Sequence, residues 1–153
     1  MSEAVVRHSR NRPRSHRGSR DMYRTLYRSP IMDRIGLITS GVQAADAKAW
    51  LDVPAIGAVH LLKALDLPVA TFNKKVRSNS KLSTAESERV LGFARLVGQV
   101  EAMVDDGGDP TGFDAGSWLA TWLTEPMPAL GNDEPITFMN TMAGQTLVSH
   151  TLA

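Results

Sequence analysis

Residues 82–104 read LSTAESERVLGFARLVGQVEAMV and predict the longest helix of this chain. Ser83 and Glu86 have the spacing of a capping box, in which each side chain bonds the backbone N–H of the other residue. The apolar residues that follow recur at helical spacing, so one face of this helix is expected to be buried. They are Val90, Leu91, Ala94, Val97, Val100, Ala102, Met103 and Val104.

Shorter helices are predicted on the N-terminal side of this segment. One begins at Ser29-Pro30, an N-cap serine followed by proline, and ends at Gly41. A second covers about residues 42–51, and a third starts near Pro54. The inward face of the third is predicted to consist of Ile56, Val59, Leu62 and Leu65.

On the C-terminal side, residues 105–110 (DDGGDP) have the composition of a loop. Further helices are predicted at about residues 113–123, 134–142 and 144–152. No segment has the sustained alternation of a strand, so we predict an all-α helical bundle.

The composition excludes several classes of protein. There is no Cys, which excludes disulfides, cysteine-based zinc sites and thiol catalysis. No apolar run approaches the ~20 residues that span a bilayer, and the Arg-rich start lacks the apolar core of a secretory signal. We therefore expect a cytoplasmic protein without membrane contact.

The formal net charge of +1 conceals a steep gradient along the chain. Eight arginines lie in residues 1–28, six basic residues lie in residues 69–95, and no Lys or Arg follows Arg95. Eight acidic residues lie beyond that point. This asymmetry favours a polyanion partner for the first two parts and a different partner for the third, although a solvated acidic surface is an alternative for the third.

Residues 1–28 combine low hydrophobicity with many charges, so they predict a disordered Arg-rich tail. Such a tail either contributes only to solubility or acts as an arm that neutralises DNA phosphates. Its composition does not decide between these roles.

The two helices predicted at about residues 54–65 and 69–77 have the layout of a helix-turn-helix, with Asp66 in the turn. With Val69, Phe72 and Val76 facing inward, the second helix presents side chains that suit bases and phosphates. A helical hairpin whose polar face binds nothing is the alternative. The predicted DNA-binding residues are Thr71, Asn73, Lys74, Lys75 and Arg77.

No arrangement of residues suits catalysis. The sequence has no glycine-rich phosphate loop and no nucleophile motif, and Glu86 is already explained as a cap. None of the four His residues has a partner at metal-ligand spacing. We expect a protein that is not an enzyme, with no catalytic residues, no metal site and no cofactor.

Three stretches, taken in order, resemble the MbcA/ParS/Xre family of antitoxins, in particular its RES-Xre branch. The first, similar to the family's Xre-type helix-turn-helix, is HLLKALDLP at residues 60–68 with Thr71-Phe72 and Lys74-Lys75. The second, LSTAESER at residues 82–89, is similar to the start of its long central helix. The third, similar to its toxin-binding module, comprises Trp122-Leu123, Pro126, Ala129-Leu130-Gly131, Pro135, Thr141, Gly144 and Val148.

This resemblance implies an antitoxin that binds the operator DNA of its own operon, as a homodimer within a toxin complex, and neutralises a RES-domain toxin that consumes NAD. In the family the last helix and tail of the antitoxin obstruct the NAD pocket of the toxin, which places residues 144–153 nearest to that pocket. Trp118 and Leu123 are expected among the apolar anchors. The implied toxin-binding residues are Trp122, Pro135, Met139, Gly144, Leu147, Val148, Thr151, Leu152 and Ala153.

The chain is thus predicted to consist of a tail (1–28), a helix-turn-helix DNA-binding domain (29–82), and a long central helix with a C-terminal toxin-binding domain (83–153). Two other functions remain open at this point. One is a pure interaction module with a vestigial helix-turn-helix, and the other is a stand-alone helix-turn-helix regulator that senses a small molecule.

Overall fold

The chain is all-α over residues 17–153, the part that a computed structural model describes, with side chains described from Met22 onward. Residues 1–16 of the predicted tail lie outside the described residues. Apart from isolated bridges between Gln43 and Lys81 and between Met127 and Asp133, the described part has no β-structure. The helices are α1 (Arg17–Arg28), α2 (Ile31–Ser40), α3 (Ala44–Trp50), α4 (Ala58–Ala64), α5 (Val69–Arg77), α6 (Thr84–Gly107), α7 (Ala115–Leu123) and α8 (Met142–Leu152), with 3-10 turns η1 (Pro128–Leu130) and η2 (Pro135–Phe138).

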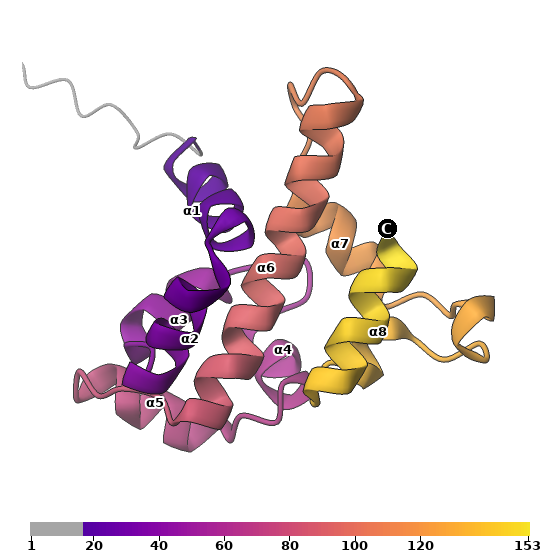
Figure 1. Cartoon of the computed structure of the whole chain (residues 1–153). Helices are drawn as coiled ribbons and strands as arrows, with labels where there is room; N and C mark the ends of the chain where they lie inside the picture. Colours follow the sequence, from indigo (N-terminus) through magenta and orange to yellow (C-terminus); the bar gives the residue numbers. More distant parts are fainter. Residues whose placement is uncertain (1–16) are drawn as a thin grey trace, which may run out of the picture.

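The long helix α6 lies in the middle of the molecule, with α1, α2, α3 and α5 to one side and α7 and α8 to the other (Figure 1). It begins with the predicted capping box: the Ser83 hydroxyl accepts from the Glu86 N–H at 3.1 Å, and Glu86 Oε1 accepts from the Ser83 N–H at 2.9 Å. Its predicted apolar face is buried up to Ala102, whereas Met103 is exposed and Val104 is half-buried. The core is therefore built around α6, and only its last turns extend beyond that core.

The N-terminal helix α1 corrects the predicted tail, because residues 17–28 are helical and form the most extensive helix–helix contact, with α6. Tyr23 is buried in the main core and donates its hydroxyl proton to the Trp50 carbonyl oxygen at 2.8 Å. Arg24 forms an ion pair with Asp105 and approaches Glu101 at 4.0 Å. The tail boundary expected at residue 28 is wrong, because apolar residues spaced along α1 bury themselves on α6.

Gly98 is the residue that lets α1 approach α6 so closely. A Cβ at this position would overlap the Tyr23 carbonyl oxygen and lie 2.7 Å from Tyr27 Cβ, closer than real Cβ atoms pack. Glycine is therefore needed at position 98 for the close packing of α1 on α6, and not for a special backbone conformation.

The helices between residues 31 and 77 follow the prediction with one change of register. α2 ends at Ser40, and Gly41 directly after it has a φ of 86°, as expected for a glycine stop. The predicted inward face of the third helix is wrong at Val59, which is exposed, because α4 begins only at Ala58. Instead of Val59, Leu61 is buried in the core together with the expected Leu62 and Leu65.

The C-terminal helices α7 and α8 pack on α6, and η2, which lies between them in the chain, packs on α4. The helix predicted at about residues 134–142 is only the single 3-10 turn η2, and α8 follows at Met142–Leu152. The loop begins at Gly108, because residues 105–107 still belong to α6. Gln145 of α8 donates through Nε2 to the carbonyl oxygens of Arg89 and Met139 at 3.0 and 2.9 Å, which fixes α8 against α6 and η2.

Candidate functional site

The hairpin of α4 and α5 is closed by the backbone of its turn and by one arginine from α6. Asp66 has a φ of 55°, and the Leu67 and Asp66 N–H groups donate to the carbonyl oxygens of Leu62 and Lys63 at 2.8 and 3.1 Å. This pairing is a Schellman motif, with aspartate at the position that usually holds glycine. Arg89 donates from Nε to the Leu65 carbonyl oxygen at 2.6 Å and from a terminal nitrogen to that of Asp66 at 3.2 Å. The angle between the two helices is therefore held by the long helix behind them.

The outer face of α5 carries most of the predicted DNA-binding residues in exposed positions. Phe72 is buried, and Val69 and Val76 are half-buried against the core, as the sequence predicted. The four side chains on the opposite, exposed face are Thr71, Asn73, Lys74 and Arg77.

Lys75 differs from these four because it is half-buried and already paired. Its Nζ donates to Glu86 Oε1 at 2.7 Å, which is the same oxygen that caps α6. Burial opposes ionisation of Glu86, but the hydrogen bonds from Lys75 and Ser83 outweigh it, so the pKa of Glu86 lies below its ordinary value. Lys75 thus joins α5 to α6, and nothing in the sequence alone distinguishes this role from that of Lys74.

The predicted toxin-binding residues fall into three groups by exposure. Leu147 and Ala153 are exposed, and Trp122, Gly144 and Thr151 are half-buried. The remaining four face the chain's own core, because η2 and α8 close the bundle at this end. They are Pro135, Met139, Val148 and Leu152.

Gly144 has a structural reason to be glycine, apart from any contact with a partner. A Cβ there would overlap the Phe138 carbonyl oxygen of η2. Its N–H donates to the hydroxyl of Thr141, the N-cap of α8, at 3.0 Å. The motif residues Thr141 and Gly144 therefore shape the first turn of the last helix.

Several apolar side chains of α7 and α8 are exposed on the surface at this end of the molecule and are not buried in the core. Trp118 is exposed and stacks on Trp122, with ring centroids 6.4 Å apart and planes inclined by 11°. Leu123, the other expected anchor, is fully buried in the core. Met142, which the sequence did not single out, is exposed at the start of α8 together with Leu147 one turn later. Helical period alone could not separate these outward positions from the inward ones, because α8 is apolar on both faces.

Within the described residues, no group of three or more His, Asp or Glu side chains is placed to hold a metal ion. None of the helices in that part combines the length and the apolar character that a membrane span requires. The exposed members of the two predicted sites lie on the polar face of α5 and on the partly apolar surface around α8.

Comparison with known proteins identifies relatives of the chain. Residues 100–153 match the family described as "Antitoxin Xre/MbcA/ParS C-terminal toxin-binding domain". A Prs ADP-ribosylating antitoxin of Sphingobium sp. (strain YBL2) is 49% identical over 131 residues, which cover 86% of this chain and 82% of that protein. The similarity extends well beyond the C-terminal segment, so it includes most of the described helices.

Proposed function

Because this chain belongs to the Xre/MbcA/ParS family of antitoxins, we propose that it neutralises a partner toxin through its C-terminal part and represses its own operon through the α4–α5 hairpin. The observation that carries the proposal is the match of residues 100–153 to the family's toxin-binding domain, within a chain that is 49% identical to an antitoxin over most of its length.

The partner that we propose is a RES-domain toxin that consumes NAD, with α8 and the end of the chain against its NAD pocket. The name of the Sphingobium relative supports an ADP-ribosylating toxin, since ADP-ribosylation takes its ADP-ribose from NAD. Leu147 and Ala153 are the exposed members of the predicted contact, and Met142 extends it along α8. The buried members support this surface from beneath, because they fix the position of α8.

The second part of the proposal is that the antitoxin, as a homodimer within the toxin complex, binds operator DNA through α5. Asn73 and Arg77 suit contacts to base edges, and Thr71 suits a thymine methyl group. Lys74 suits a phosphate, whereas Lys75 is held by Glu86 and contributes chiefly to the hairpin.

Growth rescue and co-purification test the antitoxin role. We would express this gene with its immediate neighbour and compare the wild type with Leu147→Asp and Val59→Asp, which replace apolar side chains that are 43% and 53% exposed. Leu147→Asp places a charge in the proposed interface and should abolish growth rescue, whereas Val59→Asp on α4 should leave growth rescue intact. A harmless neighbour and no complex would contradict the antitoxin role.

Salt-dependent operator binding tests the repressor role. Lys74→Ala should weaken binding to all duplexes and lower the slope of log affinity against log salt by about one. Lys48→Ala, an exposed lysine of α3, is the matched control and should leave the slope unchanged. Equal affinity of the intact protein for operator and random DNA would exclude sequence-specific repression.

A further inference from the structure

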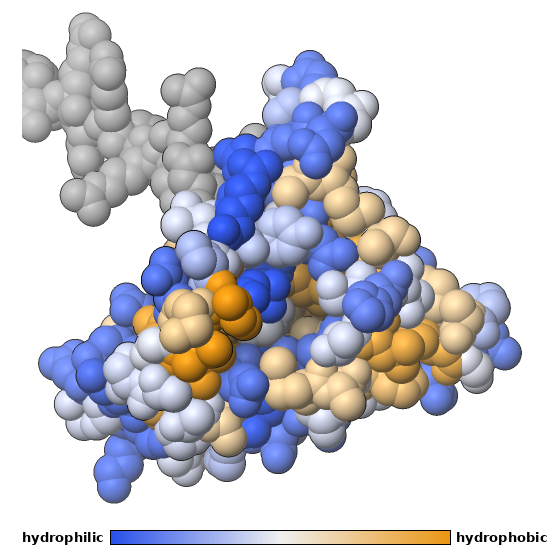
Figure 2. All heavy atoms as spheres, in the orientation of Figure 1, coloured by the Kyte–Doolittle hydropathy of each residue, from blue (hydrophilic) through white to orange (hydrophobic). Residues whose placement is uncertain are grey.

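A cleft of about 230 Å³ lies between α1, α6 and α8, next to the predicted toxin-binding surface. In Figure 2 a hollow near the centre of the face has hydrophilic side chains in its floor and a hydrophobic patch on α2 beside it. Polar groups from all three helices line the cleft: Tyr27, Arg95, Gln99, Gln145, Ser149 and His150.

Two side chains that line this cleft, Arg95 and Gln145, each have one buried polar atom without a hydrogen-bond partner among the described residues, and Arg95 is the charged one. Its Nε is buried and has no hydrogen-bond partner among the described residues. Burial, and then repulsion by Arg34 of α2, lowers the pKa of Arg95, and only Tyr27 opposes this effect. A half-buried guanidinium next to a second arginine lowers stability unless an anion compensates it.

Two other arginines that contact α6 or belong to it, Arg24 and Arg89, have their charges compensated within the chain. Arg89, on the same helix, donates to two carbonyl oxygens of the hairpin turn, and Arg24 pairs with Asp105 and Glu101. Arg95 has neither arrangement among the described residues.

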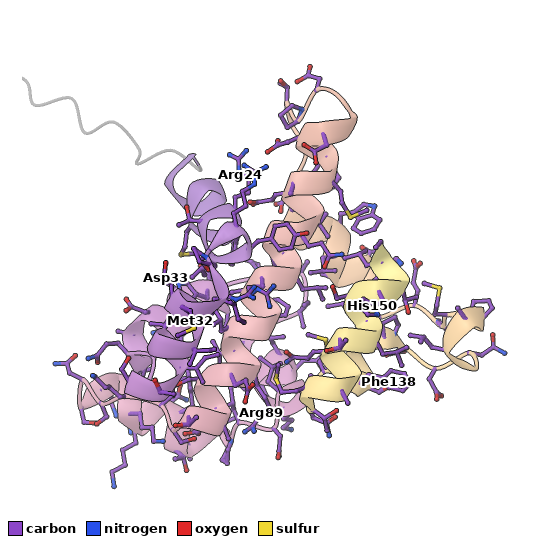
Figure 3. The ribbon with its side chains drawn as sticks, viewed as in Figure 1. Arg24, Met32, Asp33, Arg89, Phe138 and His150 are labelled. Carbon is purple, nitrogen blue, oxygen red and sulfur yellow. The ribbon has the colours of Figure 1, made fainter. Side chains whose placement is uncertain are left out.

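The surroundings of the cleft favour a protein as the source of the anion. One wall is formed by α8, which lies in the segment that matches the family's toxin-binding domain. On the other side of α6, α2 has no buried residue and exposes Ile31, Met32 and Ile35. Figure 3 shows Met32 and His150 on opposite sides of α6. Apolar side chains of this kind complement a folded partner and do not complement a phosphate backbone.

We propose that this cleft is a carboxylate-binding subsite of the toxin interface. An aspartate or glutamate of the toxin pairs with Arg95 in the cleft, and the toxin surface around that carboxylate packs on the apolar face of α2. This inference rests on the proposed antitoxin function and extends its contact beyond residues 100–153 to α1, α2 and α6. It also reverses the expectation from charge alone, since a basic anchor lies beside the acidic third of the chain.

Two measurements on Arg95→Met, made in the full chain, separate a binding role from a structural one. The variant should bind the co-expressed toxin at least about 30-fold more weakly, the loss expected for one partner of a buried charge pair. The free variant should unfold at the same temperature as the wild type or at a higher one, because an uncompensated charge has been removed. Arg95→Lys should give an intermediate affinity, since an ammonium cannot bind a carboxylate through two parallel hydrogen bonds.

Arg89→Met is the matched control, because it removes an arginine that serves the hairpin. It should unfold at a lower temperature and, while folded, keep its affinity for the toxin. An Arg95→Met variant that unfolds earlier but binds toxin as tightly as the wild type would overturn the inference. A loss of operator binding with unchanged toxin binding would also overturn it and would identify a phosphate site. If the wild type itself binds no neighbouring toxin, the proposed function fails rather than the subsite alone.

Discussion

The helices α1 and α5 are both rich in basic residues, but the described basic side chains differ in what they contact. In α1, Arg24 pairs with Asp105 and approaches Glu101, so its charge is used within the chain. In α5, Lys74 and Arg77 are exposed, and only Lys75 is paired. A cluster of basic residues therefore predicts a nucleic-acid surface only where the rest of the fold provides no acidic partner, and α6 provides such a partner for Arg24 of α1.

The two helices also differ in how far along the chain the residues that define them lie. α5 is defined by local features: the αL residue Asp66 before it and the positive-φ residue Asn79 after it. α1 depends on residues more than 20 positions away, through the hydroxyl of Tyr23 and the missing side chain of Gly98. Changes at these distant positions should therefore affect α1 and leave the hairpin in place.

The largest expected effect is that of Gly98→Ala. The added Cβ meets backbone atoms of Tyr23, so α1 must move, and we expect a loss of about 3 kcal/mol in the free energy of unfolding, as for other overpacked cores. Urea unfolding followed by circular dichroism measures it. Gly36→Ala in α2 is the matched control: a Cβ there meets nothing within 4 Å, and the change should stabilise by about 0.5–1 kcal/mol. Equal effects of the two substitutions would mean that α1 does not dock on α6 in solution.

Tyr23→Phe should have the next largest effect, about 1.5 kcal/mol at neutral pH, because it leaves the Trp50 carbonyl oxygen without its partner. Burial, together with the carboxylates of Asp52, Glu101 and Asp114, raises the pKa of Tyr23 from 10.0 to about 12. The unfolded state therefore loses its proton first, and the wild type should lose stability as the pH rises from about 10 to about 12.

Urea unfolding across that pH range tests the coupling between Tyr23 and the fold. The curves of wild type and Tyr23→Phe should converge at high pH, since the variant has no phenol to ionise at this position. Tyr27→Phe is the control, because Tyr27 is only half-buried on the same helix. Parallel curves for wild type and Tyr23→Phe would contradict a buried tyrosine that donates to Trp50.

The parts of the fold that could be predicted from the sequence are those that depend on nearby residues. The capping box of α6, the Gly41 stop, the Asp66 turn and the inward Phe72 are confirmed, because each follows from residues within one or two helical turns. α1 was missed although Met22, Tyr23, Leu26 and Tyr27 have helical spacing, since the arginines between them lower the local hydrophobicity. Its burial surface on α6 lies outside any local window, since Gly98 follows Tyr23 by 75 positions.

The candidate sites show the same division between local and distant information. The outward face of α5 followed from its inward residues, so four of its five predicted DNA-binding side chains are exposed. The toxin-binding residues were predicted from the resemblance to the antitoxin family. Such a resemblance does not distinguish residues that contact the partner from residues that hold those contact residues in position. Met139 and Val148 are fully buried, whereas the neighbouring Met142 and Leu147 are exposed, a difference that depends on how η2 and α8 pack.

The smallest expected effect separates Lys74 from Lys75, which are adjacent in sequence. Lys75→Ala removes the ion pair with Glu86 and should cost about 0.5 kcal/mol at pH 7, whereas Lys74→Ala should cost nothing, because its ammonium is exposed and unpaired among the described residues. The pKa of Glu86 lies below its ordinary value of 4.5, so its contribution is present above pH 4.5 and is lost as the pH falls through the lowered pKa. The stability difference between Lys75→Ala and wild type should therefore disappear in acid, as urea unfolding at pH 7 and pH 3 would measure. If the difference persisted at pH 3, Lys75 would stabilise the hairpin through the packing of its aliphatic stem on α6 and not through its charge.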